Sequence, residues 1–337
     1  MTRRLLLGAA TLACVLGCEG ERASVPPAEP PGSPRETATR EVKRYVDGEI
    51  GALVGAARAL CAASPDAARM RVHWHEARVR YERVEGAIAI LFPQTDADVD
   101  GRYEHVAERG TDTEPLDDRG FVGMHAIERV LWADASRPEV IAFERALPGY
   151  VPPRPLEGEA DARAFREGLC ARLVRDLAAM EAALAPVALD PQTAWRGIQG
   201  SIEEQAEKLR LGTTGQSESR YADHTLADMR ANLEGGRAVL EAFATEIEAL
   251  PDGPERLRRL REGLSQLDEA YRAIEGDGLP PVPDGFDPDA PSEAHLATPY
   301  GRLFAQLARE SDPEHAGSLA HALRETGLAM GIAPLGR

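Results

Sequence analysis

Residues 41–60 read EVKRYVDGEIGALVGAARAL, a stretch that predicts a long amphipathic helix. Its apolar side chains recur every three or four positions and therefore share one helical face. They are Val42, Val46, Ile50, Leu53, Ala57 and Leu60. Similar segments follow along the chain, and the alternation that is typical of strands appears nowhere in the sequence at useful length. We therefore predict an all-α fold built from two up-down helical bundles.

The composition supports this prediction and narrows the choice of partners. The chain has 337 residues, of which 43% are apolar and only 5% aromatic, and Ala and Leu dominate the apolar positions. This composition favours helices over strands. The net charge of −17 argues against a nucleic-acid partner, because phosphate contacts need clustered Lys and Arg. An acidic protein of this kind suits a cation as its ligand.

The amino terminus has the features of an exported lipoprotein. Arg3 and Arg4 precede a short apolar run at residues 5–16, which is too short to span a bilayer and is typical of a secretory signal. Residues 15–18, VLGC, resemble a bacterial lipobox. We predict that Cys18 is acylated and anchors the protein to a membrane of the cell envelope, on the periplasmic side. An ordinary cleaved signal with an incidental cysteine is the alternative.

The sequence divides into four parts. Residues 1–17 are predicted to be the lipoprotein signal peptide, and residues 18–38 the lipidated cysteine and a tether. Five prolines lie between residues 25 and 34, a composition typical of an extended linker. We expect residues 39–150 to form an N-terminal helical bundle with a His-x-x-Glu motif, and residues 151–337 to form a C-terminal helical bundle.

Two of the four cysteines remain once the signal peptide and the lipid anchor are set aside. Cys61 and Cys170 both lie in apolar helical patterns. An exported compartment permits a disulfide. The sequence leaves two alternatives open, a Cys61–Cys170 bridge or two buried free thiols.

Ligand-type residues occur at helical spacing in two segments. A helix predicted to run to about Leu91 carries Glu82 and Glu85, which are three residues apart and share a face. The next predicted helix carries His125 and Glu128 at the same spacing. Two such pairs can converge on one ion in a bundle, and carboxylates with imidazole suit iron, zinc, copper or manganese. Taken alone, Glu82 and Glu85 could instead belong to an ordinary solvent-exposed helix face.

The residues around both pairs resemble a known family. Residues 121–132, FVGMHAIERVLW, are similar to the F-x-G-F-H-x-x-E-x-x-L-W segment of the imelysin-like family. Residues 77–85, ARVRYERVE, resemble the A-R-x-x-Y-E-x-x-E of its EfeO/EfeM-type branch of periplasmic iron-uptake proteins. Residues 99–102 (VDGR) and 202–206 (IEEQA) resemble that branch's I-D-x-R and L-E-E-V-A segments. The resemblance covers about residues 40–250.

The resemblance implies an all-helical fold of two bundles with a metal site. The positions that match the ligand motifs are Glu82, Glu85, Asp100, His125 and Glu128, and Glu204 is a further candidate. We expect the first five to converge on one ion, with Asp100 reaching in from the loop between the two helices. Without a bound cation, their charges would be uncompensated and would repel one another.

The resemblance also implies a cargo and partners. Iron is the first candidate for the ion, divalent or trivalent, with zinc and copper as alternatives. An iron permease and a peroxidase of the same uptake system are the implied protein partners, and the lipid anchor is the expected contact with the membrane. Full-length EfeO proteins carry a cupredoxin domain before the helical one, where we expect only the Pro-rich tether.

Metal capture outside the inner membrane, without enzymatic activity, is therefore the expected function. An imelysin-like metallopeptidase is the first alternative, because the family has been associated with peptidase activity. The sequence lacks the HExxH motif, which would place two histidines and a general base on one helical face. A polysaccharide or other extracellular-ligand binder is the second alternative, and the low aromatic content disfavours it.

Overall fold

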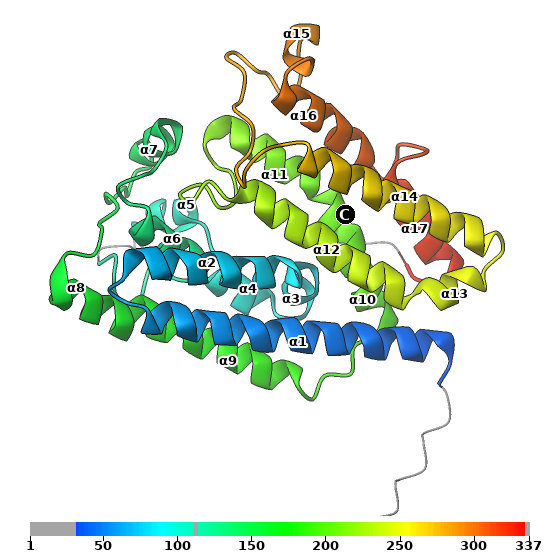
Figure 1. The fold of residues 1–337 in the computed structure, drawn as a ribbon, viewed down its shortest axis with the longest axis horizontal. Coiled ribbons are helices and arrows are strands. Elements are labelled where there is room, and N and C mark those ends of the chain that lie inside the picture. Colours follow the sequence, from blue (N-terminus) through cyan, green and yellow to red (C-terminus); the bar gives the residue numbers. More distant parts are fainter. Residues whose placement is uncertain (1–31, 111–113, 334–337) are drawn as a thin grey trace, which may run out of the picture. The chain divides into compact units, whose positions relative to one another are not determined.

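All regular structure in residues 32–110 and 114–333, which the computed structural model describes, is helical (Figure 1). This confirms the predicted all-α fold. The helices up to residue 184 are α1 (Pro34–Ala62), α2 (Ala67–Glu82), α3 (Glu85–Leu91), α4 (Pro93–Val99), α5 (Tyr103–Ala107), α6 (Met124–Leu131), α7 (Pro138–Arg145), α8 (Gly158–Phe165), the π-helix η1 (Arg166–Cys170) and α9 (Ala171–Leu184). Those that follow are α10 (Pro191–Glu203), α11 (Gln205–Leu211), the 3₁₀-helix η2 (Gly212–Thr214), α12 (Thr225–Ala242), α13 (Ala244–Glu248), α14 (Gly253–Arg272), α15 (Glu293–Leu296), α16 (Pro299–Glu310) and α17 (Leu319–Ala329).

Two predictions about the amino terminus, the signal peptide and the acylated Cys18, lie outside the described residues. Helix α1 begins at Pro34, within the segment predicted as the tether. In the described part of the chain, no helix combines the length and the apolar character needed to cross a membrane.

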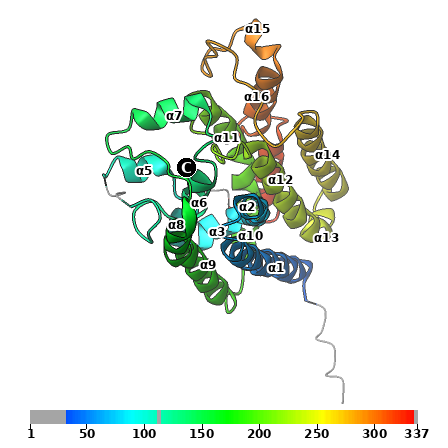
Figure 2. The ribbon, with the colours of Figure 1, turned by 60° about the vertical axis from the view of Figure 1, so that its left-hand side comes forward.

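Helix α1 is fixed at its start by a capping box. The Ser33 hydroxyl oxygen accepts a hydrogen bond from the amide of Glu36, whose carboxylate accepts one from the amide of Ser33. Pro34 occupies the first helical position. The apolar face predicted from Val42 to Leu60 is buried, because α1 packs along α2 and α9 (Figures 1 and 2).

The second predicted helix is interrupted where its backbone meets α12. The side-chain amide of Asn232 donates a hydrogen bond to the carbonyl oxygen of Glu82 at 2.8 Å. A Cβ at Gly235 would lie only 2.1 Å from the carbonyl oxygen of Arg83. These carbonyls therefore face α12, and the chain turns between α2 and α3. The prediction of one continuous helix was wrong, since Glu82 ends α2 and Glu85 begins α3.

Helices α10 and α12 connect the earlier and later parts of the chain. Helix α12 contacts α1, α2, α10 and α14, and α10 contacts α3 and α17. Asp190 caps α10 by accepting a hydrogen bond from the amide of Thr193, with Pro191 in the first turn. The described residues from Ser33 onward form one compact unit with one contiguous apolar core. The boundary between two bundles at residue 150 stays a prediction.

A disulfide links α1 to the segment before α9. Cys61 lies in the last turn of α1 and Cys170 ends η1, with their Cα atoms 5.6 Å apart. The sequence leaves open a Cys61–Cys170 bridge or two free thiols, and the structure contains the bridge.

Candidate metal centre

Five acidic or imidazole side chains from separate segments meet at one place. Glu82 ends α2, Glu85 begins α3, Asp100 follows α4, His125 lies in α6 and Glu218 lies in the turn before α12. They form two groups whose ligand-type atoms lie within 4.8 Å of one another. One group contains Asp100, His125 and Glu218, and the other contains Glu82, Glu85 and Asp100. Asp100 belongs to both groups, so the two form one continuous centre.

Gly123 brings the start of α6 against the turn that carries Asp100. Its φ is +88°, and a Cβ there would lie 2.3 Å from the carbonyl oxygen of Val99. Only glycine avoids both the left-handed strain and the clash. Because His125 follows two residues later, its Nε2 lies 3.2 Å from Oδ1 of Asp100.

Glu128 fixes the ring of His125. Its Oε2 lies 2.7 Å from His125 Nδ1, and its Oε1 accepts hydrogen bonds from the backbone amides of Tyr221 and Ala222, both at 2.8 Å. A carboxylate only accepts, so Nδ1 of the histidine carries a proton. Nε2 is buried and faces Oδ1 of Asp100 at 3.2 Å and Oε1 of Glu218 at 3.6 Å, although neither contact has hydrogen-bond geometry. Glu128 therefore points the other ring nitrogen into the centre.

Glu82 and Glu85 lie side by side although their helices are separate. The side-chain amide of Asn232 donates hydrogen bonds to Oε2 of each, at 2.7 and 3.0 Å. The ammonium of Lys208 lies 3.0 Å from Oε2 of Glu82 and 2.8 Å from Oε2 of Glu85. Burial, and less strongly the charge of Glu85, raises the pKa of Glu82 well above its ordinary value. Glu82 is thus costly to ionise without nearby positive charge.

Arg78 supplies a second buried cation, one turn before Glu82. Its guanidinium pairs with Glu82 and Asp100, and its Nη2 lies 3.3 Å from Oε1 of Glu218. Its Nε lies 3.6 Å from Oδ2 of Asp228. The expectation of uncompensated carboxylates was therefore wrong, because two cations lie among the four carboxylates of the two groups.

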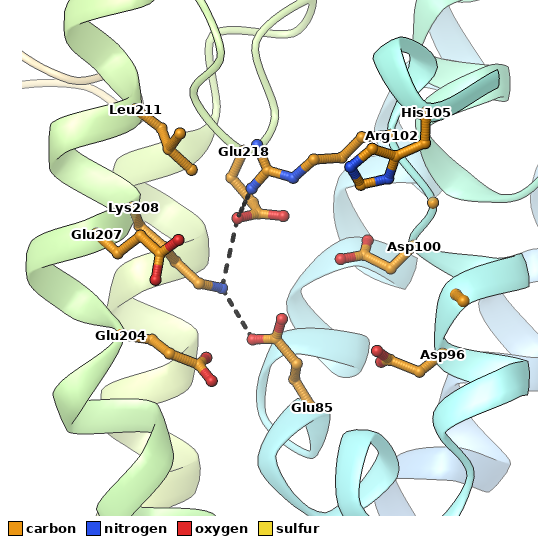
Figure 3. Close-up of a pocket in the computed structure, with 12 residues that line it drawn as sticks. Glu85, Asp96, Asp100, Arg102, His105, Glu204, Glu207, Lys208, Leu211 and Glu218 are labelled. Atoms are coloured by element: carbon orange, nitrogen blue, oxygen red, sulfur yellow. Dashed lines mark hydrogen bonds and ion pairs between the residues drawn. The ribbon is translucent and has the colours of Figure 1, made fainter. Parts of the chain in front are cut away.

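A pocket of about 410 Å³ opens onto this centre (Figure 3). Lys208 reaches from α11 toward Glu85 and Glu218, while Asp100 lies on the opposite wall. Glu204 lines the same pocket on the α11 side. The centre is therefore reached through an opening with acidic walls and a lysine in its middle.

The residues that the sequence predicted as ligands lie at three different positions relative to the centre. Those in the two groups are Glu82, Glu85, Asp100 and His125, while Glu128 lies behind the histidine and Glu204 lines the pocket. Which of them bind an ion stays a prediction. Sequence reasoning missed Glu218, which lies in a turn that matches no motif. It also gave no role to Arg78, although the spacing of four residues to Glu82 was a usable signal.

The fold and the centre together place this chain in a class of proteins. Members of this class are all-helical and have a buried cluster of carboxylates and histidine below a polar pocket. The sequence profile of the imelysin family (Peptidase M75) matches residues 38–309, and the chain belongs to this family. The iron uptake system component EfeO of Escherichia coli O1:K1 / APEC is 24% identical over 239 residues. The proteins of the same name from E. coli strain K12 and Shigella flexneri are 23% identical. Each match covers 69% of this chain and 53% of the relative, so the chain spans about half the length of these curated relatives.

Proposed function

We propose that this protein captures a metal cation, iron foremost, and delivers it to a membrane uptake system. The observation that carries the proposal is the convergence of Asp100, His125 and Glu218, whose ligand-type atoms lie within 4.8 Å of one another. Imidazole with carboxylates suits a transition metal better than calcium or magnesium. The names of the relatives, components of an iron uptake system, support iron as the cargo. Zinc and copper are the alternatives.

The donor atoms fit such a cargo. Nε2 of His125 faces the carboxylates of Asp100 and Glu218 without hydrogen-bond geometry, whereas Nδ1 is held by Glu128. This arrangement is common around metal-binding histidines, because the partner of one ring nitrogen orients the other. We therefore assign Asp100, His125 and Glu218 as ligands and Glu128 as the residue that positions the imidazole.

Glu82 and Glu85 form the second part of the proposed site. They share the ammonium of Lys208, so an arriving ion would compete with that positive charge for the same oxygens. We propose that these two carboxylates complete the coordination when Lys208 moves away. Glu204, on the pocket wall, would then be the first carboxylate that an entering ion meets.

The cellular setting belongs to the same proposal. An acylated Cys18 would hold the protein at the periplasmic side of a membrane, next to an iron permease and a peroxidase of one system. Since the chain spans about half of its curated relatives, these partners rest on the resemblance and on the relatives' names.

Calorimetric titration of the full chain with Fe²⁺ under anaerobic conditions, and with Zn²⁺ and Ca²⁺, tests the assignment. We expect His125→Ala to lower the affinity for Fe²⁺ and Zn²⁺ at least ~10-fold and to shift the preference toward Ca²⁺. The helical content of the metal-free protein should hardly change. His315→Ala, at an exposed position, is the matched control. Equal affinities in the wild type and His125→Ala would rule out His125 as a ligand.

A metallopeptidase remains the second candidate because the family profile carries a peptidase name. The centre contains one histidine, and its neighbours Arg78 and Lys208 already pair with the carboxylates. A peptidase would need a carboxylate free to act as a base on a metal-bound water. Incubation of the zinc-loaded protein with unfolded casein should therefore yield no cleavage above that of His125→Ala.

A further inference from the structure

A second pair of imidazoles lies outside the centre described above. The rings of His75, on α2, and His224, just before α12, have their centroids 4.2 Å apart. Both residues line another pocket, of about 560 Å³, whose wall also includes Asp223 and Asp277. The proposed iron site uses neither histidine.

His224 is held as metal-binding histidines commonly are. Its Nδ1 lies 3.1 Å from Oδ1 of Asp228, whose Oδ2 accepts a hydrogen bond from the hydroxyl of Ser219. Burial alone would raise the pKa of Asp228, but Arg78 and His224 hold it below its ordinary value, so the carboxylate is ionised and only accepts. Nδ1 of His224 therefore carries a proton, so Nε2 is the ring nitrogen that can bind a metal.

His75 is an imidazole without a partner. Its Nδ1 is buried and has no hydrogen-bond partner among the described residues. Burial, and next the neighbouring His224, lowers the pKa of His75 to about 4. The ring is neutral at pH 7 and carries an unused lone pair. A buried polar atom of this kind costs free energy unless something binds it.

We propose that His75 and His224 form a second metal site, which binds a late first-row divalent ion, Cu²⁺ foremost and Zn²⁺ next. Two imidazoles offer nitrogen donors that these ions prefer over Fe²⁺, and Cu²⁺ stands highest in the order of affinities. Water would complete the coordination, because Asp223 and Asp277 on the pocket wall are each paired with an arginine, Arg137 and Arg230. The site stands apart from the proposed iron site, since it shares no ligand with it.

The surrounding tryptophans make this site observable. The ring of Trp132 lies 5.3 Å from that of His75, and the ring of Trp74 lies 5.4 Å from His75 and 5.9 Å from His224. A paramagnetic Cu²⁺ ion bound to these imidazoles would lie next to two of the three tryptophans of the chain. Binding should therefore quench a large part of the tryptophan fluorescence.

The test uses the full chain with His125→Ala as background, which removes the imidazole of the proposed iron site. Cu²⁺ is titrated against a glycine buffer, and fluorescence and electron paramagnetic resonance are recorded. We expect saturable quenching and nitrogen couplings from two imidazoles. Adding His75→Phe, which keeps a ring beside Trp132, should lower the affinity at least ~10-fold and leave one imidazole. His315→Phe, at an exposed position, should change neither.

Two results would overturn the proposal. The first is an unchanged Cu²⁺ affinity and spectrum on adding His75→Phe, which would leave the pair as packed rings with no ligand role. The second result needs no substitution of His75 or His224. It is an electron paramagnetic resonance spectrum of Cu²⁺ bound to the His125→Ala protein that shows no coupling to imidazole nitrogen. His224→Gln serves as the second variant if His75→Phe does not fold, as judged by circular dichroism. Failure of the iron site would show instead in His125→Ala against the wild type, so the two outcomes are separable.

Discussion

The ammonium nitrogen of Lys208 lies 2.8 Å from Oε2 of Glu85, in the space between two groups of ligand-type side chains. It also lies 3.0 Å from Oε2 of Glu82 and 3.8 Å from Oε2 of Glu218. Burial alone would lower the pKa of Lys208, but these carboxylates hold it well above its ordinary value. The lysine is therefore a built-in cation at the place where we propose that cargo binds.

Replacing Lys208 by Met should lower the stability of the metal-free protein but raise its affinity for metal. The metal-free protein should lose about 3–5 kcal/mol, because the substitution breaks a buried charge cluster. Affinity for Zn²⁺ should rise at least ~10-fold, or about 1.4 kcal/mol, since the ion no longer competes with the ammonium. Thermal melts and calorimetry measure the two effects. Lys43→Met, which removes a pair with Asp47 near the start of α1, is the control. Unchanged affinity would show that the lysine does not oppose metal binding.

Glu128→Gln should weaken metal binding without removing a proposed ligand. The Glu128 carboxylate receives three contacts, from Nδ1 of His125 and from two backbone amides. An amide side chain offers only one acceptor oxygen, so at least one partner is lost. We expect metal affinity to fall about 10–100-fold and stability to fall by about 1–3 kcal/mol.

Calorimetry and denaturant unfolding measure these changes, with Glu269→Gln at an exposed position as control. X-ray absorption of the zinc complexes separates positioning from ligation. The number of oxygen ligands should be the same in the wild type and Glu128→Gln. A loss of one oxygen in the variant would make Glu128 a ligand, as the sequence predicted.

The helical fold could be predicted because its information is local. The face from Val42 to Leu60 follows from spacing alone, and it is buried as predicted. The break after Glu82 could not be predicted in this way. It depends on Asn232 and Gly235, about 150 positions later in the chain, which only the tertiary structure brings to that backbone.

The candidate site shows the same limit. His125 and Asp100 could be proposed from motifs, whereas Glu218 lies in an irregular turn, and its place depends on how α11 and α12 pack. The role of Lys208 is equally non-local, because it pairs with residues on α2 and α3. Motifs identify residue types that can bind a metal, but the charge balance among them appears only after folding.

Removing the disulfide should destabilise the protein without changing the proposed site. Cys61 and Cys170 are separated by 109 residues in the sequence, and a bridge across so long a loop restricts the unfolded chain strongly. The free energy of unfolding of the double variant Cys61→Ser/Cys170→Ser should be about 2–4 kcal/mol lower than that of the wild type. Thiol titration of the exported wild type, denatured without reductant, should find neither thiol free. Two titratable thiols from this pair would contradict the bridge.

The carboxyl group of Asp96 should give the stability a pH dependence of defined sign. Burial, and in addition the charge of Asp100, raises the pKa of Asp96 to about 6, although the hydroxyl of Tyr81 donates a hydrogen bond to it. In the unfolded chain the pKa returns to about 3.8. Between these values the folded protein holds a proton that the unfolded chain has released. The free energy of unfolding should therefore fall as the pH rises from about 4 to about 6.

Asp96→Asn resembles the protonated form at every pH and should remove this contribution. Urea unfolding of metal-free wild type and variant at pH 4, 5, 6 and 7, with a chelator present, measures it. We expect Asp96→Asn to gain stability relative to the wild type as the pH rises to about 6, and the difference to be constant above that. Asp47→Asn, at an exposed position, should show no such trend. Parallel curves for wild type and Asp96→Asn across this range would mean that folding does not raise the pKa of Asp96.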